Sequence, residues 1–161
     1  MATYTKPLRP YLFDCYYQWM IDNNPFHIFI QVDTTVPLLS IPSTCNEYIS
    51  PQDSTIVFNI SPQAIQDFKV HGDIISFKTR FRGIVHELEI PFSAVLSIYS
   101  QPLKFGMDFP QEQYYLEWIK QHSISISEEN QERNAPEPDQ IQQQTEGNEN
   151  PKPKNILKII E

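Results

Sequence analysis

The amino-acid composition changes abruptly in the last quarter of the 161-residue chain, and this change limits how much of the chain can fold. Between residues 127 and 150 the only aliphatic side chains belong to Ala135 and Ile141, while seven acidic residues and one arginine lie among Gln, Asn, Pro and Ser. Such a segment cannot bury enough apolar surface to offset the entropy lost when it becomes ordered. We therefore predict one folded domain over residues 1–126 and a disordered acidic linker over residues 127–152.

The last residues of the chain, 153–161, differ from this linker because they combine lysines with aliphatic side chains. Four of the five residues from Ile156 to Ile160 are aliphatic. A tail that served only as a spacer has no need for such an apolar end. A folded body, a flexible spacer and an apolar tip indicate a tethering adaptor rather than an enzyme.

The first element that we expect is a helix over residues 10–24. Pro10 fits its first turn, where a missing amide hydrogen has no cost, and Asn23-Asn24-Pro25 ends it. Apolar side chains follow the spacing of one helix face; they are Leu12, Cys15, Tyr16, Trp19 and Met20, widened by Tyr11 and Tyr17. Two interpretations remain open: this face packs on the body, or part of it pairs with a second copy in a homodimer.

The segment 26–100 has the alternation and the β-branched and aromatic content of strands. The strands that we predict are 26–32, 55–60, 74–81, 84–90 and 95–99. Arg82-Gly83 joins two of them as a tight hairpin, with Gly83 free to take a positive φ. After residue 60, Ser61-Pro62 is expected to cap one helical turn that turns Ile65 and Phe68 inward. The fold class predicted is therefore mainly β with an N-terminal helix, in a small antiparallel barrel or sandwich.

A second helix is predicted over residues 111–122. Tyr115, Trp118 and Ile119 lie on one of its faces, because residues three and four positions apart are neighbours on a helix surface. We expect this face to dock on the β body.

The residue types that catalysis or metal binding needs are present, but not in the required patterns. The four histidines form neither HxH nor HExxH, and the two cysteines, Cys15 and Cys45, form no CxxC. No serine lies in a nucleophile-elbow sequence, and no pair of acidic residues stands out as acid and base. We expect no enzymatic activity, no metal and no cofactor.

Charge and hydropathy favour a protein of the cytoplasm. The net charge of −8 argues against nonspecific binding to nucleic acid, which needs a basic surface. No apolar run approaches the roughly 18–20 residues of a membrane span, and no apolar signal-peptide core follows the N-terminus. We therefore expect a cytoplasmic chain with two free thiols and no membrane partner.

One strand combines basic and aromatic side chains. Lys78, Arg80 and Arg82 are expected on one face of the strand at 74–81 and its turn, with Phe77, Thr79 and Phe81 on the other. This pattern fits a site for an extended peptide, and it also fits a solvated face over an ordinary core. A small RNA-binding barrel is the alternative function, with the same basic face as its site.

The motifs of the chain, taken together, resemble those of the stringent starvation protein B family, the bacterial adaptors that deliver tagged substrates to the ClpXP protease. The resemblance covers residues 9–100 and the last five residues. The matching segments are Arg9-Pro10-Tyr11-Leu12, Val32-Asp33-Thr34-Thr35-Val36-Pro37, Ile56-Val57-Phe58-Asn59-Ile60-Ser61-Pro62, Phe77-Lys78-Thr79-Arg80-Phe81 and Ile90-Pro91-Phe92-Ser93-Ala94-Val95-Leu96.

The resemblance implies a homodimer and a groove for the peptide tag that trans-translation adds to stalled nascent chains. It implies that the dimer contacts come from the N-terminal helix, through Tyr11, Leu12, Cys15, Tyr16 and Trp19. It implies that the tag lies extended along Phe58, Asn59, Ile60, Thr79, Arg80, Phe81 and Gly83. Phe81 and Ile60 would then form apolar pocket wall, and Arg80 or Asn59 would bond polar tag atoms.

The resemblance also assigns a role to the C-terminal tip. Leu157, Lys158, Ile159 and Ile160 match the family peptide that docks on the N-terminal zinc-binding domain of ClpX, and Glu161 replaces the usual terminal lysine. A second departure from the family is the segment 47–53, which looks like an insertion beside the strand at 55–60.

Overall fold

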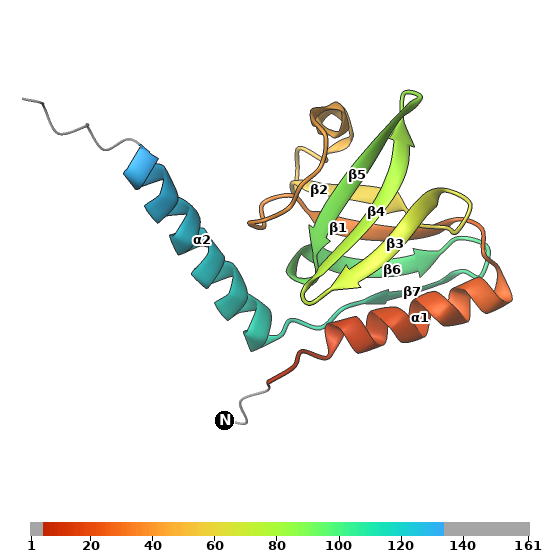
Figure 1. Cartoon of the computed structure of the whole chain (residues 1–161). Helices are drawn as coiled ribbons and strands as arrows, with labels where there is room; N and C mark the ends of the chain where they lie inside the picture. Colours follow the sequence, from red (N-terminus) through yellow and green to blue (C-terminus); the bar gives the residue numbers. More distant parts are fainter. Residues whose placement is uncertain (1–4, 134–161) are drawn as a thin grey trace, which may run out of the picture.

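The computed structural model describes residues 5–133, and it confirms the fold class predicted from the sequence. An N-terminal helix precedes seven strands in two antiparallel sheets, and a second helix follows them (Figure 1). The helices are α1 (Arg9–Asn23) and α2 (Gln113–Arg133), with short 3-10 helices η1 (Ser43–Tyr48) and η2 (Phe92–Ala94). The strands are β1 (Ile28–Asp33), β2 (Thr55–Asn59), β3 (Ile65–His71), β4 (Ile74–Phe81), β5 (Ile84–Pro91), β6 (Val95–Ser100) and β7 (Phe105–Asp108).

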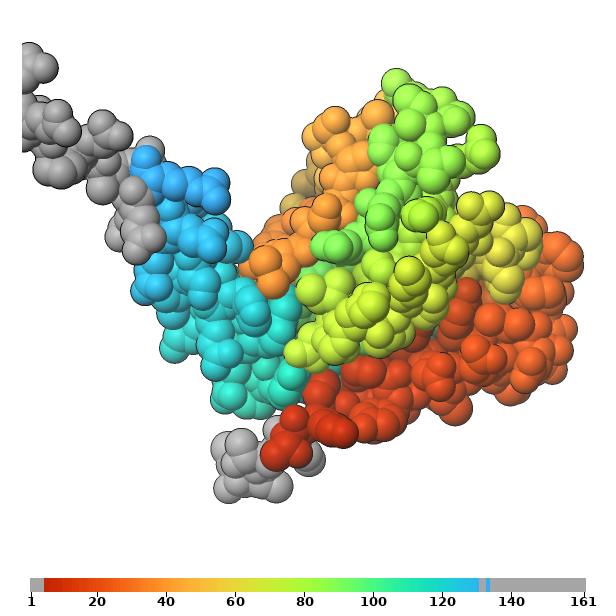
Figure 2. Space-filling view, viewed as in Figure 1, coloured from red at the N-terminus to blue at the C-terminus, as the bar shows by residue number. Residues whose placement is uncertain are grey.

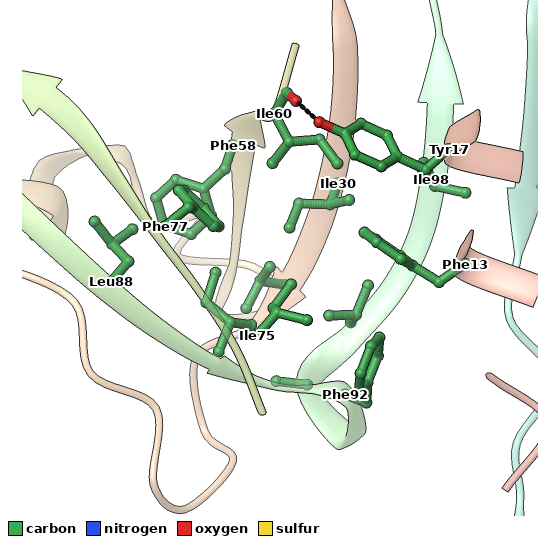
Figure 3. Packing of buried hydrophobic residues seen from close by; sticks show 14 of the residues in the cluster. Phe13, Tyr17, Ile30, Phe58, Ile60, Ile75, Phe77, Leu88, Phe92 and Ile98 are labelled. Atoms are coloured by element: carbon green, nitrogen blue, oxygen red, sulfur yellow. Dashed lines mark hydrogen bonds between the residues drawn. The ribbon is translucent and has the colours of Figure 1, made fainter. Parts of the chain in front are cut away.

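The core lies between a four-stranded sheet, ordered β2-β1-β6-β7, and a three-stranded sheet, ordered β3-β4-β5. Alternate residues of β1 point inward, so that Ile28, Ile30 and Val32 have no exposed surface. Figure 3 shows side chains of both sheets and of α1 meeting in this core. Two sheets that share one apolar interior are the arrangement expected from alternating strands.

Helix α1 confirms the predicted helix, but its buried face differs from the predicted stripe. The apolar side chains that it buries are Phe13, Tyr17 and Met20. The Tyr17 hydroxyl donates a hydrogen bond to the Ile60 carbonyl at 2.5 Å (Figure 3), and burial raises the Tyr17 pKa to about 12. Of the stripe predicted from the spacing, Met20 is fully buried, Leu12 and Tyr16 are partly buried against the core, and Cys15 and Trp19 are exposed.

The predicted hairpin between β4 and β5 is confirmed residue by residue. Phe81 pairs with Ile84, and the two residues between them, Arg82 and Gly83, have φ angles of 50° and 79°. Two consecutive positive φ angles are the mark of a two-residue turn that suits the twist of a hairpin. Gly83 therefore adopts the conformation expected of it.

A turn does follow Ser61-Pro62, because the Ser61 carbonyl accepts hydrogen bonds from the Ala64 and Ile65 amides at 2.8 and 3.3 Å. Ile65 and Phe68, which we expected in that turn, instead belong to strand β3. The inward orientation of its two apolar residues is nevertheless correct: Ile65 is buried and Phe68 packs against the core. A β-bulge between Gln66 and Lys69 explains both outcomes. The extra residue shifts the alternation, so that side chains three positions apart face the same side, as they would in a helix.

Helix α2 docks through the face predicted for it but is longer than predicted. Tyr115 and Trp118 are buried, and Ile119 packs against the core. The helix continues to Arg133, although we expected it to end at residue 122 and the chain to be disordered from residue 127. No Pro or Gly interrupts residues 123–133, and extending a docked helix avoids the cost of nucleation. Residues 134–152 of the predicted linker and the tip 153–161 lie outside the described residues.

Arg9, the first residue of α1, links this helix to η2, to the start of β6 and to the segment that precedes α2. Its guanidinium donates hydrogen bonds to four main-chain carbonyls at 2.9–3.3 Å, those of Phe92, Ser93, Val95 and Pro110. It also lies over the Tyr115 ring, 4.5 Å from the ring centroid. Burial lowers the Arg9 pKa, an effect that Tyr115 and Glu112 oppose. These bonds pair the two terminal nitrogens of a buried cation with carbonyl oxygens, which fixes α1 and α2 relative to the sheets.

Candidate functional site

A groove of about 370 Å³ lies between β2 and the end of the β4–β5 hairpin. A volume of this size falls in the range of ligand sites. The lining comes from four strands and the turn before β3, and it comprises Val57, Phe58, Asn59, Gln63, Ala64, Gln66, Lys78, Thr79, Arg80, Phe81 and Val85. The groove is thus a product of the packing of the two sheets rather than of any single segment.

Strand β2 gives the groove an open main-chain edge. It pairs with β1 alone, and the Ile60 amide just after it donates to the Ile28 carbonyl at 2.8 Å. Because antiparallel strands alternate the direction of their main-chain groups, those of Val57 and Asn59 face away from β1. An edge of this kind can accept hydrogen bonds from, and donate them to, an added extended chain.

The opposite wall is the part of β4 that extends past β3. Strand β3 begins opposite Thr79, so Arg80 and Phe81 pair only with β5, through Val85 and Ile84. The Thr79 hydroxyl donates to the Ala64 carbonyl at 3.2 Å and ties the start of β3 to this wall. From Arg80 onward, the edge of β4 that faces the groove pairs with no strand among the described residues.

Aromatic rings form the floor of the groove. Phe58 is buried and meets Phe77 and Phe81 edge-to-face, with ring centroids 6.3 Å apart in each pair. Phe81 is partly buried, and its ring lies 6.1 Å from that of His86. Figure 3 shows Phe58 and Phe77 packed against each other at this end of the core. Rings in this arrangement are held in place before any ligand binds.

The three basic residues of the β4–β5 hairpin differ in their partners. Lys78 forms an ion pair with Asp67 at 2.9 Å, which raises the Lys78 pKa and lowers the Asp67 pKa. Arg82 forms an ion pair with Glu47, and their hydrogen bond raises the Arg82 pKa. Arg80 is exposed and forms no ion pair within residues 5–133. One arginine therefore remains available to a ligand in the groove.

Five of the seven residues expected in the tag groove line it, namely Phe58, Asn59, Thr79, Arg80 and Phe81. Ile60, expected as pocket wall, is instead fully buried beneath it, and Gly83 lies at the hairpin turn outside the lining. The basic and the aromatic side chains were expected on opposite faces of β4, yet side chains of both kinds line the groove. The groove opens at the edge of this strand, where side chains from either face can reach it.

Sequence reasoning missed Val57, Gln63, Ala64, Gln66 and Val85 as lining residues. Val57 could have been found, because alternation with the buried Phe58 places it outward. Gln63 and Gln66 could not, since only the packing of the turn and of β3 against β4 brings them to the groove. Val85 becomes part of the groove only through the register of the hairpin.

Of the five residues expected at the dimer interface, three are exposed on α1 and two flank its core face. Tyr11 and Trp19 are 60% and 44% exposed, Cys15 is exposed, and Leu12 and Tyr16 are partly buried. Phe105 of β7 extends this surface, because its ring stacks on Tyr16 at 5.7 Å and meets Trp19 at 5.3 Å. Tyr16, Trp19 and Phe105 thus form an aromatic surface along α1 and β7, and Tyr11 is exposed farther along the helix.

The part of the chain that the structure describes offers neither a cluster of metal ligands nor a helix that could span a membrane. No group of three or more His, Cys, Asp or Glu side chains there could hold a metal ion. Neither of the described helices is both long and apolar enough to cross a membrane.

Comparison with known proteins agrees with the motifs. The chain matches the family model described as stringent starvation protein B over residues 7–161. A curated relative from Haemophilus influenzae, described as a stringent starvation protein B homolog, is 37% identical over 111 residues, which cover 69% of this chain and 70% of the relative. These matches confirm the family resemblance inferred from the sequence.

Proposed function

We propose that this chain, which belongs to the stringent starvation protein B family, is a proteolytic adaptor that binds the trans-translation tag and tethers tagged proteins to the ClpXP protease. The observation that carries the proposal is the groove between β2 and the β4–β5 hairpin, with its open strand edge and aromatic floor. These are the features with which proteins bind extended peptides: main-chain bonds supply affinity, and side-chain pockets supply choice.

In this proposal the tag adds an extended segment along β2. The main-chain groups of Val57 and Asn59 bond the tag backbone, and Phe81, above Phe58, receives an apolar tag side chain. Arg80, which forms no ion pair within residues 5–133, binds a carboxylate or carbonyl of the tag. The side-chain carbonyl of Asn59 already accepts a hydrogen bond from the Ser61 amide at 3.0 Å, so its amide group is the part free to donate.

A second copy of the chain covers the aromatic surface of α1 in the same proposal. Exposed Tyr11 and Trp19, and Phe105 beside Trp19, are the residue types enriched in protein interfaces. A dimer carries two grooves and two C-terminal tips, so that one adaptor contacts the protease twice.

The tether is the part of the chain beyond α2, and we assign it to residues 134–152. A flexible chain of about 20 residues spans roughly 25 Å on average. The tip at 153–161 docks on the N-terminal zinc-binding domain of ClpX through Leu157, Ile159 and Ile160. Two weak contacts then act together, because the tether raises the local concentration of substrate at the unfoldase. The adaptor lowers the apparent KM for tagged substrates more than it changes the maximal rate.

The cargo site is tested by fluorescence anisotropy of a labelled tag peptide with the full chain, at low and high salt. Saturable binding that persists at high salt supports the proposal. Absence of binding would refute it. A labelled single-stranded RNA measured in parallel tests the alternative function, because binding through phosphate contacts weakens steeply as salt is added.

The tether is tested separately by deleting residues 154–161. The deletion is expected to leave tag binding unchanged while it abolishes the stimulation of ClpXP degradation of a tagged reporter. Degradation that continues unchanged would refute the tethering mechanism even if the cargo site is correct.

A further inference from the structure

The free end of the β4–β5 hairpin has little support from its own sheet. Strand β3 covers β4 only as far as Thr79, so residues 80–85 form a two-stranded ribbon that stands out from the body (Figure 2). Isolated two-stranded hairpins are marginally stable in water. The same ribbon contributes Arg80, Phe81 and Val85 to the groove, so the position of one groove wall depends on whatever supports it.

The segment 40–48 lies beside this hairpin and contacts it at two levels (Figure 1). Near the base, Ser40 and Glu89 exchange two main-chain hydrogen bonds, at 2.8 and 3.0 Å. At the turn, the Glu47 carboxylate accepts a hydrogen bond from the Arg82 guanidinium. The segment is itself fixed in the core, because Cys45 of η1 has no exposed surface. Glu47 thus extends from a fixed point to the unsupported end of the hairpin.

We propose that Glu47 is a positioning residue for peptide binding, which braces the end of the β4–β5 hairpin through Arg82 and so holds one wall of the groove in place. The inference rests on the proposed function for its effect on the tag, but the brace itself does not depend on the cargo. Glu47 and Arg82 are both absent from the groove lining, so the pair acts on the ligand through the position of Arg80, Phe81 and Val85.

The first experiment measures the brace without any ligand. Hydrogen exchange of the backbone amides of residues 80–85 is compared in the wild-type chain, in Glu47→Ala and in Arg82→Ala. Exposed ion pairs have modest effects, so exchange is expected to rise roughly two- to five-fold in either variant, with no change in β1. Glu128→Ala is the control, because it removes one negative charge from the exposed part of α2. Unchanged exchange in both Glu47→Ala and Arg82→Ala would overturn the proposal.

The second experiment measures tag affinity in the same proteins. Glu47→Ala and Arg82→Ala are each expected to raise the Kd by roughly two- to five-fold, the double variant no further than the single ones. The exchanged pair, Glu47→Arg with Arg82→Glu, is expected to restore affinity. If Glu47 and Arg82 acted on the peptide directly through their charges, swapping the two residues would not restore the affinity, and that result would refute the positioning role. An unchanged Kd together with faster hydrogen exchange at residues 80–85 would refute it too. If the wild-type chain binds no tag, the proposed function fails, and the exchange data alone decide whether the brace exists.

Discussion

The groove contains two exposed valines, and their truncation is the sharpest test of where the tag binds. Val57 of β2 and Val85 of β5 are 47% and 48% exposed and lie on opposite walls. Valine to alanine removes two carbon groups, worth about 1.6 kcal/mol if fully buried. About half of each side chain is already covered in the free protein, so the tag can bury only the remainder, worth about 0.8 kcal/mol. Val57→Ala and Val85→Ala are therefore each expected to raise the Kd about fourfold.

Val70→Ala is the matched control for this test. Val70 lies on β3, is 52% exposed and does not line the groove, so its truncation removes the same atoms from a similar environment. Anisotropy titration of a labelled tag peptide measures all three variants, and thermal unfolding checks that each remains folded. If Val57→Ala and Val85→Ala bind like the wild type, the tag does not occupy this groove. If Val70→Ala weakens binding equally, the loss of affinity reflects a general change in the β-sheets rather than the loss of a contact with the tag.

Other substitutions test Arg80, the buried hydrogen bonds of Tyr17 and Arg9, and the C-terminal tip. Arg80→Gln is expected to weaken tag binding roughly two- to five-fold at low salt and less at high salt, because an exposed charge is screened; anisotropy across a NaCl series measures this. Tyr17→Phe is expected to cost about 1 kcal/mol in urea unfolding at pH 7, since the Ile60 carbonyl loses its donor. Burial raises the Tyr17 pKa from 10.0 to about 12, so the hydroxyl loses its proton at a lower pH in the unfolded chain than in the folded one. The stability of the wild type is therefore expected to fall between pH 10 and 12, and Tyr17→Phe is expected to lessen that fall. Arg9→Met removes the Arg9 donor from four carbonyls, of which that of Phe92 keeps the Val95 amide; it is expected to cost about 3–5 kcal/mol by the same assay, since each buried carbonyl left unpaired costs roughly 1–3 kcal/mol. Glu161→Lys is expected to tighten docking on ClpX, measured by the concentration of adaptor that gives half-maximal degradation.

The sequence by itself determined the elements whose signals are local. The two-residue turn at Arg82-Gly83 was predictable because so few conformations close a hairpin with two residues. The helix at the N-terminus and the docking face of α2 followed from spacing alone, since Tyr115 and Trp118 repeat with the period of a helix. The motifs likewise identified the family, which the family match confirms.

The tertiary structure decided which face each element buries and where the groove lies. Spacing placed one apolar stripe on α1, but both sides of this helix are rich in aromatics, and only packing on the sheets selects Phe13 and Tyr17 for the core. The bulge in β3 gave a strand the inward spacing of a helix, so periodicity alone assigned the wrong element there.

The groove is the clearest case of a feature that local patterns cannot specify. Its walls come from β2 and from the end of β4, which belong to different sheets and are more than 15 residues apart in the chain. Their separation depends on how the two sheets pack and on where β3 starts opposite Thr79. These are long-range contacts, whose geometry is set by the packing of the whole core rather than by the residues that line the groove.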